Sequence, residues 1–145
     1  MFVCFTLING IVKANTANDL RRADKLLSNE KYDKSFDLYQ RIATEDDAPI
    51  AQFNLALFYD FGWGRNKNAK KACQWYKKAA SNEVPMAANA YGKCLAKGTL
   101  GSIDYSEAAI WFKKAAELGL HFSYCSLGDL YINGQGVEKD IQKGL

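Results

Sequence analysis

The sequence contains only two prolines and one histidine in 145 residues. So little proline leaves room for long helices, because proline interrupts the hydrogen bonds of a helix interior. Familiar Ser/His/Asp or Cys/His catalytic arrangements would all have to use the single histidine, His121. The four cysteines, at positions 4, 73, 94 and 125, contain no Cys-x-x-Cys pair, so a zinc site would have to be assembled from distant segments. We therefore expect no metal centre, no cofactor and no catalytic triad.

The chain also lacks an excess of charge and a long apolar run. It carries 19 basic and 16 acidic residues, a formal net charge of +3 that is too mild to indicate a nucleic-acid binder. Its longest apolar run is far too short to span a bilayer, which excludes a multi-pass membrane protein. With 48% hydrophobic and 24% charged residues, the composition is that of a soluble globular protein of about one domain.

The N-terminal segment is the most apolar part of the chain. Residues 1–12 read MFVCFTLINGIV and are followed by Lys13, Ala14 and a polar stretch. A segment of this length with an A-x-A-like end is typical of a secretory signal peptide, although no basic residue precedes it. We predict a signal peptide over residues 1–14 and a periplasmic or secreted protein. The alternative is an apolar segment that packs on the first helix of a cytoplasmic protein.

A 36-residue repeat organises the rest of the chain. The segments that start at Ala51, Ala87 and Ser123 align at this spacing. In each, apolar and small residues at offsets 0, 4, 5 and 8 form one face of a helix. A glycine-rich loop follows, and then a second helix with inner Ala, Trp and aromatic positions. Such pairs of helices predict an all-α fold, an α-solenoid of stacked antiparallel pairs. Further positions recur at the same spacing: the expected helix N-caps Asn68, Asp104 and Asp140, the core residues Trp75 and Trp111, and two KKAA segments at 77–80 and 113–116.

The repeat resembles the Sel1-like repeat family, which is related to the tetratricopeptide repeat. The family pattern A-x-x-x-L-G-x-x-Y-x-x-G-x-G-V-x-x-D is matched closely by residues 123–140, while the loop of the middle unit departs from it at Thr99 and Leu100. We divide the single domain 15–145 into a divergent tetratricopeptide-like cap at 15–49 and repeats at 50–85, 86–121 and 122–145. The last repeat stops one turn into its second helix. Leu127, Leu130 and Tyr131 would then lie on or near a face that awaits cover, so we expect self-association or a docked partner segment there. The alternative is that the final repeat frays and the protein stays monomeric.

By analogy with tetratricopeptide repeats, the resemblance implies a concave face lined by variable positions of the first helices. The predicted partner-binding residues are Arg21, Lys25, Phe53, Leu57, Asp60, Phe61, Asn89, Lys93, Lys97, Cys125, Asp129 and Asn133. Apolar anchors beside charges are typical of a protein interface. The alternative is that the apolar members pack on neighbouring helices and that charged ones such as Asp60 and Lys93 are ordinary surface residues.

Two function classes follow from the resemblance. The first is a non-enzymatic, exported protein-binding module, with adaptor roles in envelope assembly, host interaction or signalling. Exported members include immunity proteins that block phospholipase toxins of the type VI secretion system. The second is an enzyme, because cysteine-rich secreted relatives are linked to β-lactam binding and hydrolysis. Those relatives carry regular cysteine pairs within each repeat, whereas the cysteines here fall at three different repeat positions.

The cysteines themselves allow two states. The first helix of one repeat runs antiparallel to the second helix of the preceding repeat, so Cys94 and Cys73 could approach each other. A bridge requires Cα atoms within about 7 Å. We expect free buried thiols that act as small apolar side chains, with the Cys73–Cys94 bridge as the alternative.

Overall fold

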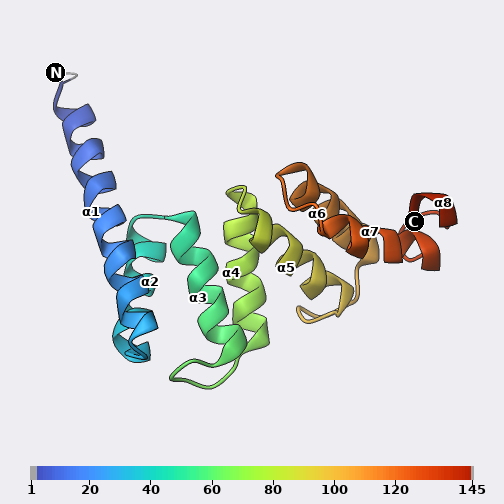
Figure 1. The fold of residues 1–145 in the computed structure, drawn as a ribbon, viewed down its shortest axis with the longest axis horizontal. Helices are drawn as coiled ribbons and strands as arrows, with labels where there is room; N and C mark the ends of the chain where they lie inside the picture. The colour runs from blue at the N-terminus through green and yellow to red at the C-terminus, as the bar shows by residue number, and fades with distance from the viewer. Residues whose placement is uncertain (1–2, 145) are drawn as a thin grey trace.

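A computed structural model describes the backbone of residues 3–144 and the side chains of residues 15–144. All the regular elements of this part are helices, and Figure 1 shows them in one row with α1 and α8 at opposite ends. The prediction of an all-α fold is therefore confirmed. The helices are α1 (Val3–Ser28), α2 (Tyr32–Glu45), α3 (Pro49–Phe61), α4 (Ala69–Ser81), α5 (Pro85–Ala96), α6 (Tyr105–Glu117), α7 (Ser123–Asn133) and α8 (Ile141–Gly144).

The helices make their main contacts with their neighbours in the chain, α1 with α2 and so on to α7 with α8. A solenoid of helix pairs has this property, because each repeat touches only the repeats beside it. The predicted signal peptide 1–14 lies outside the residues whose side chains are described. The described side-chain contacts of α1 with α2 start at Thr16, whose hydroxyl donates to Asp46 over 2.8 Å.

Buried side chains form two clusters along the row. The first joins α1, α2 and α3 around Tyr39, Ile42 and Phe58, none of which is exposed to solvent. The second runs from α3 to α7 around Tyr76, Tyr91, Phe112 and many alanines. Each large apolar side chain that is fully buried contributes roughly 1.5–3 kcal/mol to the stability of the folded state. Tyr59 and Trp75 pack against both clusters, so the buried core extends along the solenoid without a single centre.

Glycine at one position of the repeat lets the paired helices approach closely. This position is Gly92 in α5 and Gly128 in α7. A Cβ added at Gly92 would lie 2.7 Å from Cε1 of Phe112, and one added at Gly128 would lie 2.7 Å from the carbonyl oxygen of Gly144. Real Cβ atoms are not found this close to other heavy atoms. The absence of a side chain at these two positions therefore sets the spacing of α5 to α6 and of α7 to α8.

The second helices start at the residues that the repeat predicts as N-caps. The side-chain oxygen of Asn68 accepts from the Lys71 amide over 2.9 Å, and that of Asp104 accepts from the Glu107 amide over 2.9 Å. Asp140 accepts from the Lys143 amide over 3.0 Å. Each cap satisfies an amide that the first turn of a helix leaves without a partner. The cap prediction is confirmed in all three repeats.

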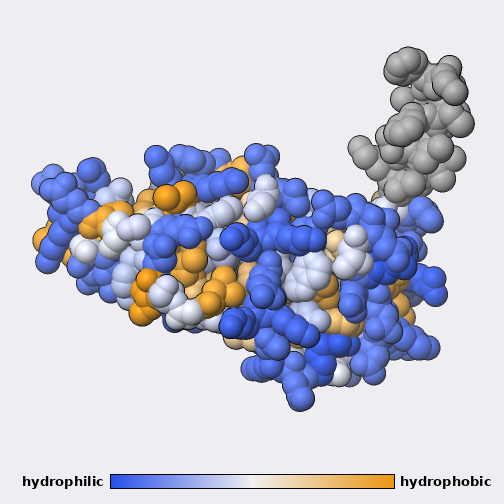
Figure 2. Space-filling model, turned by 180° about the vertical axis from the view of Figure 1, so that it is seen from behind, coloured by the Kyte–Doolittle hydropathy of each residue, from blue (hydrophilic) through white to orange (hydrophobic). Residues whose placement is uncertain are grey.

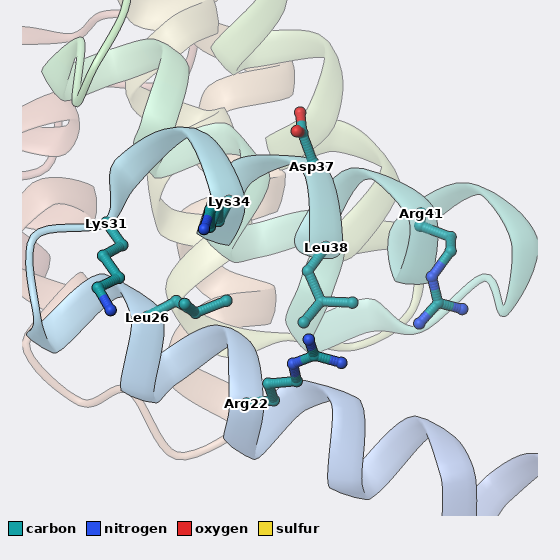
Figure 3. Close-up of a pocket in the computed structure, with 7 residues that line it drawn as sticks. All are labelled: Arg22, Leu26, Lys31, Lys34, Asp37, Leu38 and Arg41. Carbon is teal, nitrogen blue, oxygen red and sulfur yellow. The ribbon is translucent and has the colours of Figure 1, made fainter.

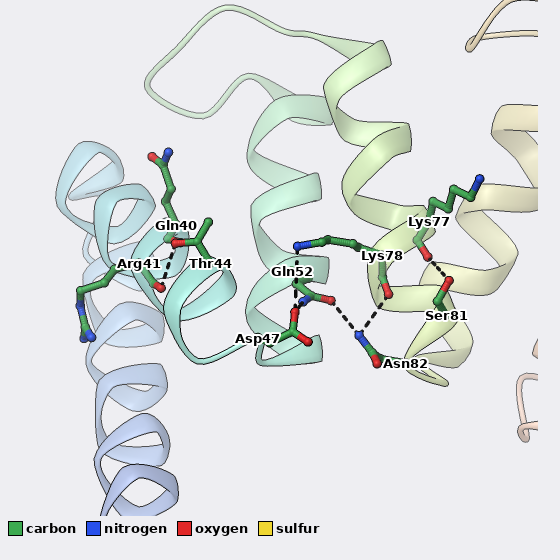
Figure 4. Close-up of polar contacts among 9 residues, drawn as sticks. All are labelled: Gln40, Arg41, Thr44, Asp47, Gln52, Lys77, Lys78, Ser81 and Asn82. Carbon is green, nitrogen blue, oxygen red and sulfur yellow. Dashed lines mark hydrogen bonds and ion pairs between the residues drawn. The ribbon is translucent and has the colours of Figure 1, made fainter.

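The turns that lead from one repeat to the next contain a residue with positive φ at the same repeat position. These residues are Asp47 (φ 49°), Glu83 (φ 62°) and Gly119 (φ 100°). Asp47 is held by the buried Gln52, whose Nε2 donates to its Oδ1 over 2.6 Å, and the Asn82 amide donates to Gln52 over 3.3 Å. Figure 4 shows this network between the start of α3 and the end of α4.

Two details of the core differ from the sequence expectation. Trp75 and Trp111 pack on the core but are only partly buried, whereas their neighbours Tyr76 and Phe112 are 4% and 3% exposed. In the first repeat, Tyr39 lies 36 residues before Trp75 and so falls at the tryptophan position of the repeat. Instead it is fully buried like Tyr76, because the loop between α1 and α2 is short and shifts α2 by one residue.

The C-terminal repeat also differs from the expectation. Leu127 and Leu130 are only 9% and 4% exposed, because they pack into the cluster that runs from α3 to α7. The expectation that they await cover was wrong. The large apolar side chains exposed near this end are instead Phe122, Tyr124 and Ile141, at 54%, 52% and 56%. In Figure 2 the orange, apolar areas of the rear face lie mainly in the half away from α1.

Candidate binding surface

The predicted binding residues lie on the first helix of each pair, α1, α3, α5 and α7. We call this surface the first-helix face. Most of the predicted residues are exposed there, and Phe53 and Leu57 are partly buried against the core. The exposed ones are Arg21, Lys25, Asp60, Phe61, Lys93, Lys97, Cys125, Asp129 and Asn133.

Three of these residues surround a common hollow. Asp60 of α3, Lys93 of α5 and Lys97, which directly follows α5, line a cavity of about 210 Å³. Its wall is completed by Tyr76 and by a disulfide between Cys73 of α4 and Cys94 of α5, whose Cα atoms are 5.9 Å apart. The expectation of free thiols at these positions was wrong, and the alternative bridge is the one the structure contains. The bridge joins two different repeats, because α4 ends one pair and α5 begins the next.

Tyr76 presents a polar group to this hollow although most of its side chain is buried. Its hydroxyl donates to Asp60 Oδ2 over 2.9 Å. Burial raises the pKa of Tyr76, and the negative charge and hydrogen bond of Asp60 raise it further. Its ring lies 5.8 Å from that of Phe53. The result is a continuous strip from an aromatic ring through a carboxylate to two ammonium groups.

The first repeat contains the same tyrosine–aspartate pair. The Tyr39 hydroxyl donates to Asp24, which lies 36 residues before Asp60. Burial and Asp24 together raise the pKa of Tyr39. Sequence reasoning placed Tyr76 on the inner helix face and missed its hydroxyl bond. The recurrence of an aspartate near the end of the first helix and a tyrosine in the second helix was the signal that could have revealed it.

Asn89 does not belong to the exposed surface. Its side chain is only 5% exposed, and its Oδ1 accepts from the Ser123 hydroxyl over 3.0 Å. This bond links α5 to α7 in the interior, where polar groups need partners. The assignment of Asn89 to the binding surface is therefore corrected to a structural role between repeats.

The other predicted residues lie outside the hollow. Phe61 stacks on Trp63 with ring centroids 5.1 Å apart, and Asn133 donates to the carbonyl oxygen of Asp129 over 2.8 Å. Cys125 is an exposed free cysteine. Within the part of the chain that the structure describes, no cluster of His, Cys, Asp and Glu could hold a metal ion. No described helix is long and apolar enough to cross a membrane.

The fold and the mixed polar and apolar surface define an α-solenoid of the kind that binds other proteins. The model of the Sel1 repeat matches residues 49–84, 85–120 and 121–145, and the chain belongs to this family. Sel1 repeats generally mediate protein–protein interaction.

Solved structures and a curated relative agree with this assignment. A Sel1 repeat protein from Oxalobacter formigenes has a TM-score of 0.78 at 32% identity, over 89% of this chain and 54% of that one. The Helicobacter pylori cysteine rich protein B has a TM-score of 0.65 at 26% identity, over 81% and 90%. Among curated proteins, chitin synthase regulatory factor 3 of Schizosaccharomyces pombe is 29% identical over 104 residues, 70% of this chain. The chain spans only 11% of that relative's length.

Proposed function

We propose that this protein is a non-enzymatic binding module that holds a segment of a partner protein on its first-helix face. The observation that carries the proposal is the strip formed by Phe53, Tyr76, Asp60, Lys93 and Lys97. An apolar side chain of the partner packs on Phe53, and a partner carboxylate pairs with the two lysines. Exposed ammonium groups beside a recessed aromatic ring suit such a segment, because apolar contact supplies affinity and charge pairing supplies selectivity.

A photo-crosslinking amino acid placed at Lys93 tests this proposal in the cells that make the protein. The matched control is the same amino acid at Ile110, which is 65% exposed on the second helix α6. We expect a discrete crosslinked partner from position 93 only. The purified partner should then bind Lys93→Glu/Lys97→Glu protein at least about tenfold more weakly, a loss of about 1.4 kcal/mol. Equal crosslinking from both positions would argue against the first-helix face.

Export is part of the proposal, and the Cys73–Cys94 disulfide supports it. Disulfides persist in oxidising compartments and are rare in the cytosol of most organisms. Cleavage after Ala14 would also retain the contact of Thr16 with Asp46. N-terminal sequencing of the protein from a periplasmic or culture fraction should begin at Asn15. Recovery of the full-length chain from the cytosol alone would contradict export.

For an exported protein of this family, we propose immunity against a phospholipase toxin of the type VI secretion system as the specific role. A small solenoid with a charged hollow on its first-helix face suits the tight capture of a single toxin. Co-production with such a toxin in the periplasm should restore growth, and Lys93→Glu/Lys97→Glu should abolish the protection. Growth that stays inhibited by every toxin of this class would exclude the role.

The β-lactam-hydrolysing alternative finds no support in the disulfide arrangement. The bridge joins α4 to α5, which belong to successive repeats, whereas the resemblance implies cysteine pairs within each repeat. Turnover of nitrocefin by the purified protein would favour the β-lactam-hydrolysing enzyme over the non-enzymatic binding module.

Association through residues 123–145 also remains a proposal, now carried by Tyr124 and Ile141. Both side chains are more than half exposed although they are large and apolar. Light scattering across a concentration series should show association that Tyr124→Lys weakens. A parent protein that is monomeric at high concentration would refute self-association.

A further inference from the structure

A second hollow lies at the N-terminal end of the solenoid, between α1 and α2. Its volume is about 470 Å³. The floor contains Leu26 of α1 and Leu38 of α2, both partly buried. Figure 3 shows these two leucines between the helices, with cationic side chains around them. We call this hollow the α1–α2 groove; the residues that line it are Arg22, Leu26, Lys31, Lys34, Asp37, Leu38 and Arg41.

The charges of the α1–α2 groove are unbalanced. Arg41 is paired with Asp19 over 2.5 Å and lies 3.9 Å from Glu45. Arg22, Lys31 and Lys34 are exposed and have no ion pair among the described residues. The only acidic residue in the lining is Asp37, and Figure 3 shows its carboxylate pointing away from α1. Three unpaired cations therefore surround an apolar floor.

We propose that the α1–α2 groove is a second docking surface, separate from the first-helix face, that takes an acidic amphipathic segment of a partner protein. One apolar side chain of the segment packs on Leu26 and Leu38. Its carboxylates pair with Arg22 on one side and with Lys31 and Lys34 on the other. Because all three unpaired side chains are cationic, the groove favours an acidic segment and repels a basic one.

The shape of the groove favours a peptide over a membrane surface. The leucines are recessed between two helices, where a side chain can reach them. Binding to a bilayer instead places apolar side chains on a protruding face, so that they enter the acyl region.

The test measures binding of the full chain to a fluorescein-labelled peptide of alternating glutamate and leucine pairs, about twelve residues long, by fluorescence anisotropy. The groove variant is Arg22→Glu/Lys34→Glu. The matched control is Lys70→Glu/Lys139→Glu, which makes the same change in net charge at two exposed lysines outside the groove. We expect the groove variant to weaken binding at least about tenfold and the control to change it less than about twofold. Leu26→Asn should also weaken binding without lowering the thermal midpoint of unfolding by more than a few degrees.

Three results would overturn the proposal. Equal weakening by the groove variant and its control would show that only net charge matters. Groove-dependent binding to phosphatidylserine vesicles that exceeds binding to the peptide would assign the surface to membranes. Self-association that the groove variant abolishes would assign it to a second copy. Loss of the first-helix partner through Lys93→Glu should leave peptide binding unchanged, so the two docking surfaces can fail independently.

Discussion

Glu83 and Asp47 occupy the same strained backbone position in successive repeats, and replacement by glycine should affect them in opposite directions. Both have positive φ, at 62° and 49°. A left-handed conformation costs a residue with a Cβ roughly 1–2 kcal/mol, which glycine avoids. Glycine also gains freedom in the unfolded chain, which lowers stability by about 0.4–1 kcal/mol. No hydrogen bond or ion pair of the Glu83 side chain occurs among the described residues, so Glu83→Gly should stabilise the protein by about 0.7 kcal/mol.

Asp47→Gly removes the same strain but also an acceptor. Asp47 Oδ1 accepts from the Gln52 amide over 2.6 Å, and Gln52 is fully buried. A buried donor left without its partner costs about 1–3 kcal/mol, so Asp47→Gly should destabilise the protein by about 1 kcal/mol net. Thermal and urea unfolding measure both changes, with midpoint shifts of about 2–4 °C per kcal/mol in a chain of this size. Shifts of the same sign in the two variants would refute the assignment of Gln52 as the deciding contact.

Three further outcomes can be checked on the same protein. Trp111→Ala should lower stability by about 2 kcal/mol in urea unfolding, less than a fully buried tryptophan would, because this one is only partly buried. Reduction of the Cys73–Cys94 bridge should lower it by about 3 kcal/mol, and a urea midpoint that is the same with and without reductant would contradict the bridge. The raised pKa of Tyr76 means that the native state favours the protonated phenol. The stability that the protonated phenol contributes is therefore fully present below about pH 10 and is lost as the pH rises further. Stability should therefore fall above pH 10, and Tyr76→Phe should reduce the fall.

The fold could be predicted from the sequence because each local structural signal, such as a helix cap, recurs at the same position in three repeats. Asn68, Asp104 and Asp140 recur as caps because each second helix has the same unsatisfied first turn. The packing of two glycines, Gly92 and Gly128, follows from the same periodicity. Propensity and pattern agree at these positions, which makes them predictable.

The candidate binding surface was harder to predict because it depends on how helices of different repeats face each other. The sequence left the bridge between Cys73 and Cys94 open, since only the distance between α4 and α5 decides it. Asn89 was placed on the surface because a first-helix position does not reveal whether the next repeat covers it. Lys31 and Lys34 were missed because charges on a divergent cap look like ordinary solvent-facing residues, and the groove appears only when α1 and α2 are paired.

The disulfide between successive repeats has a consequence for the response of the protein to mechanical pulling. A solenoid stretched from its ends unravels repeat by repeat, since each repeat is held mainly by its neighbours. The bridge closes a loop with a sequence separation of 21 between α4 and α5. At about 3.3–3.6 Å per residue, roughly 70 Å of chain therefore stays out of reach of the applied force until the bridge is reduced. The segment between Cys73 and Cys94 should therefore not lengthen under force, whereas the cap and the last repeat, which lie outside the bridge, can unfold and extend.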